Sequence, residues 1–310
     1  MNLVDLAQHF GDEDKARKFL EKQRWPEGPV CPHCGLLGEA YRLTPTADGK
    51  THVRKGVWKC AGCRKEFTVT VGTIFEDSHI PLHKWLLAYH LLCASKKGMS
   101  AHQLHRMLGI TYKSAWFMAH RIRYTMSQEP LSSKLKGVVE ADETFVGGKI
   151  KGKGRYVARQ KKAPVVALVE RDGRARSFHL EEVTAKNLRP LLKEHIAGSA
   201  ELMTDDSGLY RGMKKHFKSH DVVKHMSGEY VRRKNGRTIH TNTVEGFFSI
   251  LKRGIVGTFH QVSKRHLHRY LSEFDFRYNA RDVSDGDRAM LAVKGIERKR
   301  LMYRDSCARA

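Results

Sequence analysis

The chain has 310 residues, 40% of them hydrophobic, which is enough for two or three compact units with cores of their own. The 57 lysines and arginines outnumber the 33 aspartates and glutamates, and the formal net charge is +24. The composition excludes a wholly disordered chain, and the charge favours a polyanionic partner, above all nucleic acid, over a protein that is merely basic and soluble.

Neither a secretory signal nor a membrane span is expected. The first residues (MNLVDLAQHFGDEDKAR) contain acids and lack an apolar core region. The longest apolar run, WLLAYHLLCA at residues 85–94, is far shorter than the roughly 20 residues that cross a bilayer. We therefore expect a soluble, cytoplasmic protein without a membrane partner.

Residues 1–25 are expected to form an N-terminal helical segment. DEDKARKFLEKQRW places Phe19, Leu20 and Trp25 where they can supply the apolar contacts of a helix. Asp12 or Asp14 can cap its start. Prolines at positions 26, 29 and 32 then end the helix.

Residues 26–77 contain two C-x-x-C pairs, separated by 25 residues. In a reducing compartment this pattern favours metal binding over disulfides, and four thiolates can surround a zinc ion tetrahedrally. Redox-active dithiols are the alternative, which two matched pairs make less suitable. We expect a zinc ribbon in which VWKC and KEFTVTVGTIF form strands. Its structural Zn²⁺ would be bound by Cys31, Cys34, Cys60 and Cys63.

Residues 78–130 are expected to be helical. Apolar residues recur at helical spacing after Pro81, a short helix follows Ser100, and a turn at Gly109 leads into a second helix. This helix–turn–helix pattern places Tyr112 and Lys113 at the start of a recognition helix, where they can contact DNA. An ordinary helical bundle is the alternative.

Residues 137–281 change to strand and turn patterns, and the expected order is β-β-β-α-β-α-β-α-α. Residues 184–196 (TAKNLRPLLKEHI) and 208–217 (GLYRGMKKHF) are expected as helices. The order predicts a mixed α/β domain in which an antiparallel meander leads into parallel strands. A basic helical tail over residues 282–310 has no predicted role.

Acidic residues lie on three separate elements of this domain. Glu140 and Asp142 share one face of a strand, and Ala141 and Glu143 share the other. A buried carboxylate needs a cation or hydrogen-bonding partners, and carboxylates are the ligands that Mg²⁺ or Mn²⁺ prefers. Each acid alone fits a cap, a turn or a surface ion pair, but their combination in a basic chain favours a catalytic metal site. The candidates are Asp142, then Asp205 or Asp206, and Glu245.

A basic run, KIKGKGRYVARQKK at residues 149–162, follows the first acidic strand directly. Its composition predicts a mobile loop or hairpin. A solvated charged loop is the alternative to a loop that contacts DNA phosphates. The residues proposed for phosphate contact are Lys149, Lys151, Lys153 and Arg155, together with Arg253.

Three blocks of sequence, ADETFVGGK, MTDDSGLYRGM and the long HTNTVEGFFSILKRGIVGTFHQVSKRHLHRYLSEFDFRYN, resemble the ISXO-like insertion-sequence transposases. The resemblance implies an α/β fold, with an RNase H-like mixed-sheet catalytic core preceded by a zinc ribbon and a helical DNA-binding unit. It implies that Asp142, Asp205 and Glu245 form a metal-binding DDE triad. Lys252 matches a basic position that contacts the DNA end, and Phe248 stands where many relatives have Trp.

The resulting hypothesis is a DDE transposase that cleaves the DNA ends of its element and joins the freed 3′-hydroxyl to target DNA by two-metal phosphoryl transfer. Its partner would be double-stranded DNA, bound by at least a homodimer because two ends must be brought together. The alternatives are a DNA-binding regulator or inactive domesticated transposase, and a structure-specific nuclease with the same core.

Overall fold

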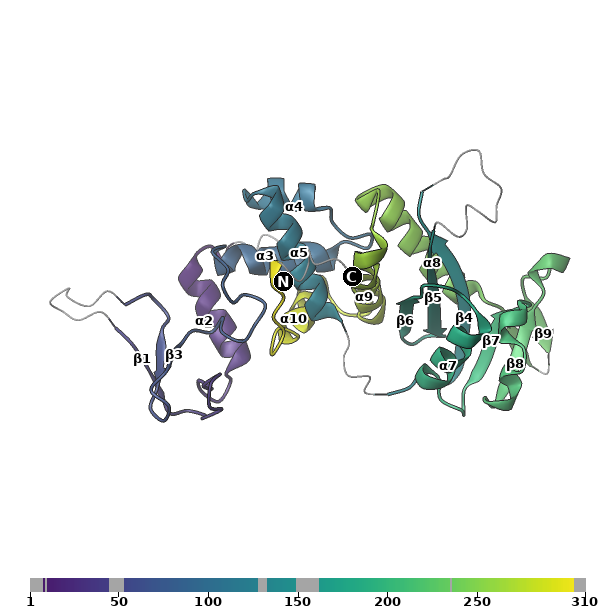
Figure 1. Ribbon diagram of the computed structural model, residues 1–310, viewed down its shortest axis with the longest axis horizontal. Helices are drawn as coiled ribbons and strands as arrows, with labels where there is room; N and C mark the ends of the chain where they lie inside the picture. Colours follow the sequence, from purple (N-terminus) through teal and green to yellow (C-terminus); the bar gives the residue numbers. More distant parts are fainter. Residues whose placement is uncertain are drawn as a thin grey trace. The chain divides into compact units, whose positions relative to one another are not determined.

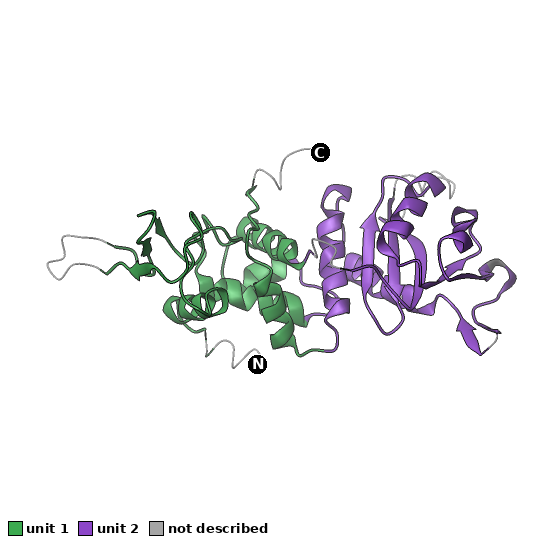
Figure 2. Ribbon diagram, turned by 90° about the horizontal axis from the view of Figure 1, so that it is seen from below, with its two compact units in different colours: residues 1–94, 101–126, 283–309 green, residues 95–100, 127–282, 310 purple. Residues whose placement is uncertain are grey.

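The computed structural model describes residues 8, 10–44, 53–127, 133–148, 162–234 and 236–303. They fall into two compact units, shown in different colours in Figure 2. Unit 1 comprises residues 1–94, 101–126 and 283–309, and unit 2 comprises residues 95–100 and 127–282.

Unit 1 contains helix α2 (Glu13–Arg24), which Asp12 caps by accepting a hydrogen bond from the backbone N–H of Lys15. A small antiparallel sheet follows, in the order β1 (Ala40–Arg42), β2 (Trp58–Cys60) and β3 (Glu66–Phe67). The prediction that a strand continues through residue 75 is wrong. After β3 the chain forms turns, in which the hydroxyl of Thr73 donates a hydrogen bond to the carbonyl of Thr70. Local Thr side-chain bonds therefore replace the ladder that the β-rich composition predicts.

The rest of unit 1 is helical, with α3 (Leu82–Ala94), α4 (Ala101–Leu108) and α5 (Tyr112–Met126). Helix α10 (Asp285–Lys294), from the C-terminal end of the chain, packs against α3 and α5. Two arginines form hydrogen bonds between these segments. Arg288 of α10 donates to the carbonyl of Cys93 in α3, and Arg121 of α5 donates to the carbonyl of Leu301. The C-terminal residues thus complete the same unit in which the chain begins.

Unit 2 is built on a five-stranded sheet in the order β6-β5-β4-β7-β8 (Figure 1). The strands β4 (Val138–Val146), β5 (Ala163–Glu170) and β6 (Ala175–His179) form an antiparallel meander. The strands β7 (Glu201–Asp205) and β8 (Ser219–Val223) run parallel to β4 and to each other. The mixed α/β sheet predicted from the sequence is therefore confirmed.

Helices cover both faces of this sheet. On one face, α8 (Asn242–Gly254) and α9 (Lys264–Asn279) pack on Val165, Ala167 and Val169 of β5. On the other face, α7 (Ala185–His195) packs on alternate residues of the same strands, among them Ala141 and Val166. Burial on both faces explains why β5 reads as an almost continuous apolar run.

Residues 208–217 do not form the expected helix. The chain forms two short 3₁₀ turns instead, Gly208–Tyr210 and Met213–Lys215. Gly212 lies between them with φ +85°, a left-handed conformation that separates the first turn from the second. Two further elements are not predicted by the local sequence patterns: the hairpin of β9 (Arg232–Lys234) and β10 (Arg237–Ile239), and the π-helical turn Ile255–Phe259 after α8.

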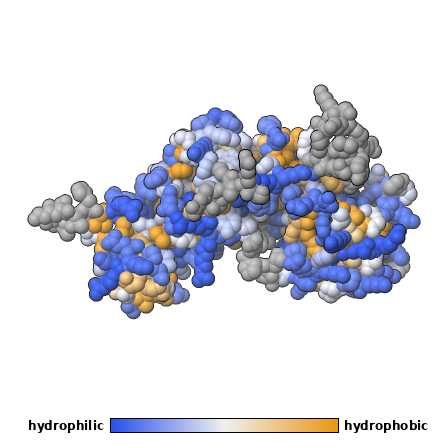
Figure 3. Space-filling view, in the orientation of Figure 1, coloured by the Kyte–Doolittle hydropathy of each residue, from blue (hydrophilic) through white to orange (hydrophobic). Residues whose placement is uncertain are grey.

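The face in Figure 3 is largely hydrophilic, with separate apolar patches. The large exposed apolar side chains include Tyr112, Tyr230 and Val256. Within the described residues, no helix combines the length and the hydropathy that crossing a membrane requires.

Candidate active site and metal centres

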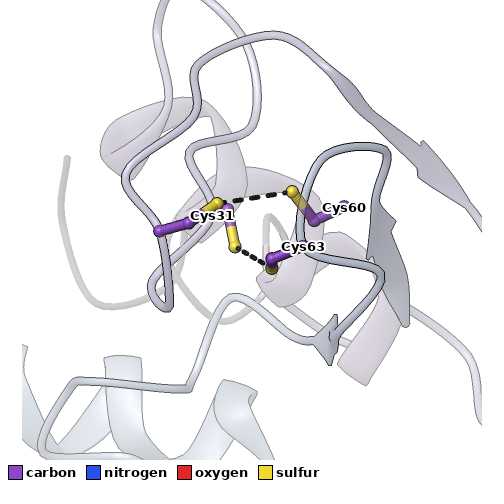
Figure 4. Close-up of side chains that lie close together, drawn as sticks. Cys31, Cys60 and Cys63 are labelled. Atoms are coloured by element: carbon purple, nitrogen blue, oxygen red, sulfur yellow. Dashed lines mark hydrogen bonds between the residues drawn. The ribbon is translucent and has the colours of Figure 1, made fainter.

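The four cysteines of the two C-x-x-C pairs face one another in unit 1 (Figure 4). Their Sγ atoms all lie within 4.8 Å of one another. The Sγ–Sγ distances between Cys31 and Cys63 and between Cys34 and Cys60 are both 3.6 Å. A tetrahedral Zn²⁺ with Zn–S bonds of about 2.3 Å separates its sulfurs by about 3.8 Å. The cluster therefore fits a structural zinc ion, as the sequence predicts.

Local backbone geometry prepares these thiols for a metal. Burial raises the pKa of Cys31, but backbone N–H groups of Cys34 and His33 outweigh it and bring the pKa to about 7. The backbone N–H of Leu36 lowers the pKa of Cys34, whereas burial and the neighbouring thiols raise it to about 11. Hydrogen bonds with neighbouring thiols lower the pKa of Cys31 and raise that of Cys34, so the protonation of these two cysteines is coupled. Zinc binds thiolates, so metal binding would release these protons.

In unit 2 the parallel pairing of β4 and β7 places two of the predicted acids side by side. Glu140 is level with Met203 in the register, so Asp142 and Asp205, two residues further along, lie at the same height and on the same face. Asp205 is the last residue of β7, and its Oδ1 accepts the backbone N–H of Ser207 at 3.1 Å. Asp206 follows it and is exposed. This placement favours Asp205 over Asp206 as a partner of Asp142.

The pKa of Asp142 is raised from 3.8 to about 7. The largest cause is burial, and the negative charges of Glu143, Asp205 and Glu245 add to it, while the backbone N–H of Glu143 opposes it. Burial and the charge of Asp206 likewise raise the pKa of Asp205. Asp205 and Glu245 therefore lie close enough to Asp142 for their charges to disfavour its ionised form.

Helix α8 presents the third acid, Glu245, in its first turn. Its Oε1 accepts from the hydroxyl of Thr241 at 3.3 Å and lies 3.4 Å from Nε2 of His225. Nε2 of His225 also lies 3.0 Å from the hydroxyl of Thr241, and its charge lowers the pKa of Asp205. Sequence reasoning missed His225, because nothing in its local pattern distinguishes it from the other histidines.

Glu143 points to the opposite face of β4, as the strand alternation predicts. Its Oε2 accepts a hydrogen bond from the hydroxyl of buried Tyr210 at 2.7 Å. Burial and the charge of Glu143 raise the pKa of Tyr210 well above its usual range, so the phenol stays protonated and remains a donor. Tyr210 thus ties β4 to the 3₁₀ turn that follows Asp205.

Glu140 is the second residue whose role the sequence did not reveal. Its carboxylate is fully buried. It accepts hydrogen bonds from Nε of Arg171 (2.7 Å), from the backbone N–H groups of Thr243 (2.7 Å) and Val244 (3.0 Å), and from the Thr243 hydroxyl (3.0 Å). Nδ1 of His240 lies 3.1 Å away. A signal was present, because an acid inside a buried strand needs such partners.

Among the described residues, the cysteines form the only group of three or more metal-ligating atoms within 4.8 Å of one another. The carboxylates of Asp142, Asp205 and Glu245 are more widely spaced. Their mutual repulsion and the raised pKa of Asp142 are the electrostatic conditions that a divalent cation relieves. The oxygen donor set fits Mg²⁺ or Mn²⁺, and a bound ion would draw the three side chains together.

The predicted DNA-binding residues lie on two elements. Tyr112 and Lys113 are exposed at the start of α5. The Tyr112 ring stacks on His102 at a centroid distance of 4.2 Å, and Nζ of Lys113 lies 4.6 Å from the Tyr303 ring centre. Lys252 and Arg253 are exposed in the last turn of α8, seven and eight residues after Glu245. The remaining predicted contacts lie outside the described residues: Lys149, Lys151, Lys153 and Arg155.

Two family models match the chain. The ISXO2-like transposase domain matches residues 134–279, and the transposase zinc-ribbon domain matches residues 11–66. A Halobacterium salinarum protein described as an uncharacterized protein in transposable element ISH50 is 27% identical over 290 residues, which cover 86% of this chain and 91% of the relative. No solved structure matches the chain.

Proposed function

We propose that this chain, which matches the ISXO2-like transposase domain over residues 134–279 and the transposase zinc-ribbon domain over residues 11–66, is an insertion-sequence transposase that cleaves the DNA at the ends of its element and joins the freed 3′-hydroxyl to target DNA. The observation that carries the proposal is the convergence of Asp142, Asp205 and Glu245. They come from two strands and a helix, and their charges act on one another.

Each acid has a role in this proposal as a ligand. Asp142 and Asp205 offer carboxylates at the same height on neighbouring parallel strands, and exposed Glu245 closes the group from α8. Divalent cations bound there supply activation of the attacking oxygen and stabilisation of the leaving oxygen in phosphoryl transfer. The protein holds the ligands on rigid elements, which keeps the reacting groups oriented.

The excess of basic residues supports DNA as the substrate. With a net charge of +24, the chain attracts a polyanion. The carboxylates would repel DNA without bound cations, so metal binding and DNA binding at this site are expected to reinforce each other. Tyr112 and Lys113 would contact the element end, and Lys252 and Arg253 would hold phosphates near the acids. Two ends must be joined, so the active form would be at least a dimer.

The test is an assay with a pre-cleaved element end, target DNA, and Mg²⁺ or Mn²⁺. A transposase yields a strand-transfer product in which the 3′-hydroxyl end is covalently joined to target DNA. Cleavage of an intact end without joining would instead identify a nuclease. Sequence-specific binding without cleavage or joining would identify a regulator.

A further inference from the structure

The buried carboxylate of Glu140 connects the strand of one proposed metal ligand to the helix of another. Glu140 and Asp142 lie on the same face of β4, two residues apart, where α8 packs on the sheet. Through Thr243 and Val244 the Glu140 carboxylate holds the first turn of α8, and Val244 directly precedes Glu245. Glu140 therefore lies two residues before Asp142 on β4, and its partners Thr243 and Val244 lie two residues and one residue before Glu245 on α8.

This contact replaces an ordinary helix cap. Thr241, at the N-cap position of α8, makes no capping hydrogen bond with its side chain. The first backbone N–H groups of a helix need acceptors, and negative charge is favoured there by the helix dipole. Glu140 supplies both from a neighbouring strand for the N–H groups of Thr243 and Val244, while Nδ1 of His240 accepts the N–H of Asn242 at 3.2 Å. The position of α8 therefore depends on β4 as well as on the residues before the helix.

Arg171 fixes the segment that leads into α8. Its guanidinium donates to Glu140 and also to the backbone carbonyls of Thr238 (2.7 Å) and His240 (2.9 Å). One ion pair thus ties together β4, the turn after β5, and the connection from β10 to the helix. Breaking a buried pair from one side leaves the other partner without its counter-charge, so the pair resists independent movement of these elements.

We propose that Glu140 is a positioning residue that sets the distance and orientation of Glu245 relative to Asp142, and so determines how well the acids bind a divalent cation. The inference rests on the proposed function of these acids as metal ligands. Removing a residue that orients a metal ligand without binding the metal itself commonly lowers metal affinity or activity by about 10–100-fold.

The experiment compares Glu140→Gln with Glu273→Gln. Glu273 is also fully buried and paired with an arginine, Arg277 on α9, so its substitution controls for the loss of a buried ion pair. For each zinc-loaded full-length protein, we would measure the Mn²⁺ dissociation constant by calorimetry. Asp142→Asn serves to subtract binding outside the acids. Single-turnover cleavage of an element-end duplex would be followed against Mn²⁺ concentration, with duplex affinity measured separately.

The expected result is that Glu140→Gln raises the Mn²⁺ dissociation constant and the half-saturating Mn²⁺ concentration by about 10–100-fold. Its affinity for the duplex without metal should stay unchanged. Glu273→Gln should lower stability at most, with wild-type Mn²⁺ dependence. If Glu140→Gln does not fold, Thr243→Val removes only the hydroxyl donated to Glu140 and should raise the Mn²⁺ requirement to a smaller extent.

Wild-type Mn²⁺ affinity in folded Glu140→Gln, or in Thr243→Val where Glu140→Gln does not fold, would overturn the inference. An equal loss of affinity in Glu273→Gln would also overturn it, since the effect would then be general destabilisation. A wild-type protein that binds Mn²⁺ through Asp142 but does not cleave DNA would refute the proposed function alone, and the effect of Glu140 on affinity would still stand. Absence of Asp142-dependent Mn²⁺ binding would overturn both.

Discussion

Replacing Asp142 with Asn is expected to abolish DNA cleavage and, in protein without added divalent cations, to stabilise unit 2. Asn has nearly the same shape as Asp, and its Oδ1 can still accept the backbone N–H of Glu143, which lies 2.7 Å from the native Oδ1. The substitution therefore removes the charge and little else. It also removes the ionised carboxylate that the proposed metal site requires.

The magnitude follows from the raised pKa. Burial and neighbouring acids raise the pKa of Asp142 from 3.8 to about 7, so the folded protein holds this proton more tightly than the unfolded chain. Stability is therefore lost as pH rises from about 4 to about 7, and each pKa unit corresponds to about 1.4 kcal/mol. At about pH 8 Asp142→Asn should be more stable than the wild type by up to ~4 kcal/mol, and below about pH 4 the two should be equal.

The tryptophans allow this effect to be measured unit by unit. All four, Trp25, Trp58, Trp85 and Trp116, lie in unit 1. Urea unfolding followed by tryptophan fluorescence therefore reports unit 1, whereas far-UV circular dichroism reports both units. Asp142→Asn should shift the unfolding transition of unit 2, which is seen by circular dichroism alone, and should leave the fluorescence transition of unit 1 unchanged. Millimolar Mn²⁺ should stabilise the wild type and leave the variant unchanged.

Two results would refute the reasoning. Equal stability of the two proteins at about pH 8 would mean that the ionised carboxylate is not destabilised, so the acids would not repel one another as the raised pKa indicates. Undiminished cleavage by Asp142→Asn would remove Asp142 from the catalytic triad. A gel-shift measurement with the element end provides the control, because DNA binding by unit 1 should persist in the variant.

Three further predictions concern other parts of the chain. Cys60→Ser should lose zinc, measured by elemental analysis, and should shift the fluorescence transition of unit 1; an unchanged zinc content would contradict the four-cysteine site. Lys113→Ala should weaken binding to the element end and reduce the slope of log affinity against log salt by up to about 0.9, whereas an unchanged slope would show that Lys113 contacts no phosphate. Gly254→Ala should destabilise unit 2 by about 1–3 kcal/mol in urea unfolding, because its Cβ would lie 2.4 Å from Phe274 and 2.8 Å from the carbonyl of Lys97; wild-type stability would mean that α8 can move away from α9.

The sequence predicted features that depend on local spacing. The two C-x-x-C pairs predicted the sulfur cluster, because tetrahedral zinc needs four thiolates and little else. Strand alternation placed Glu140 and Asp142 on one face, which the packing of α8 on that face confirms. The helix expected at residues 184–196 is present, and the side chain of Thr184 caps it by accepting from the backbone N–H of Asn187.

Features that depend on contacts between distant segments were not predicted. The role of Glu140 is not visible in the local sequence, because its partner Arg171 lies 31 residues away and the α8 backbone more than 100 residues away. The prediction of a helix at residues 208–217 was wrong, because the left-handed conformation of Gly212 outweighs the helical spacing of the apolar residues around it. Whether Asp142, Asp205 and Glu245 bind metal remains a prediction that experiment must test.

The packing of α10 on α3 and α5 means that the segment forming the five-stranded sheet lies, in the sequence, between segments that together form unit 1. During synthesis, α3 and α5 leave the ribosome well before α10 does. The apolar surface that Ala289, Ala292 and Val293 cover would stay open until α10 has been synthesised. A chain truncated before residue 283 would carry the acids of the sheet, but α5, which carries the proposed DNA contacts Tyr112 and Lys113, would lack the support of α10. Synthesis of α10 would thus act as a checkpoint before the proposed DNA contacts are in place.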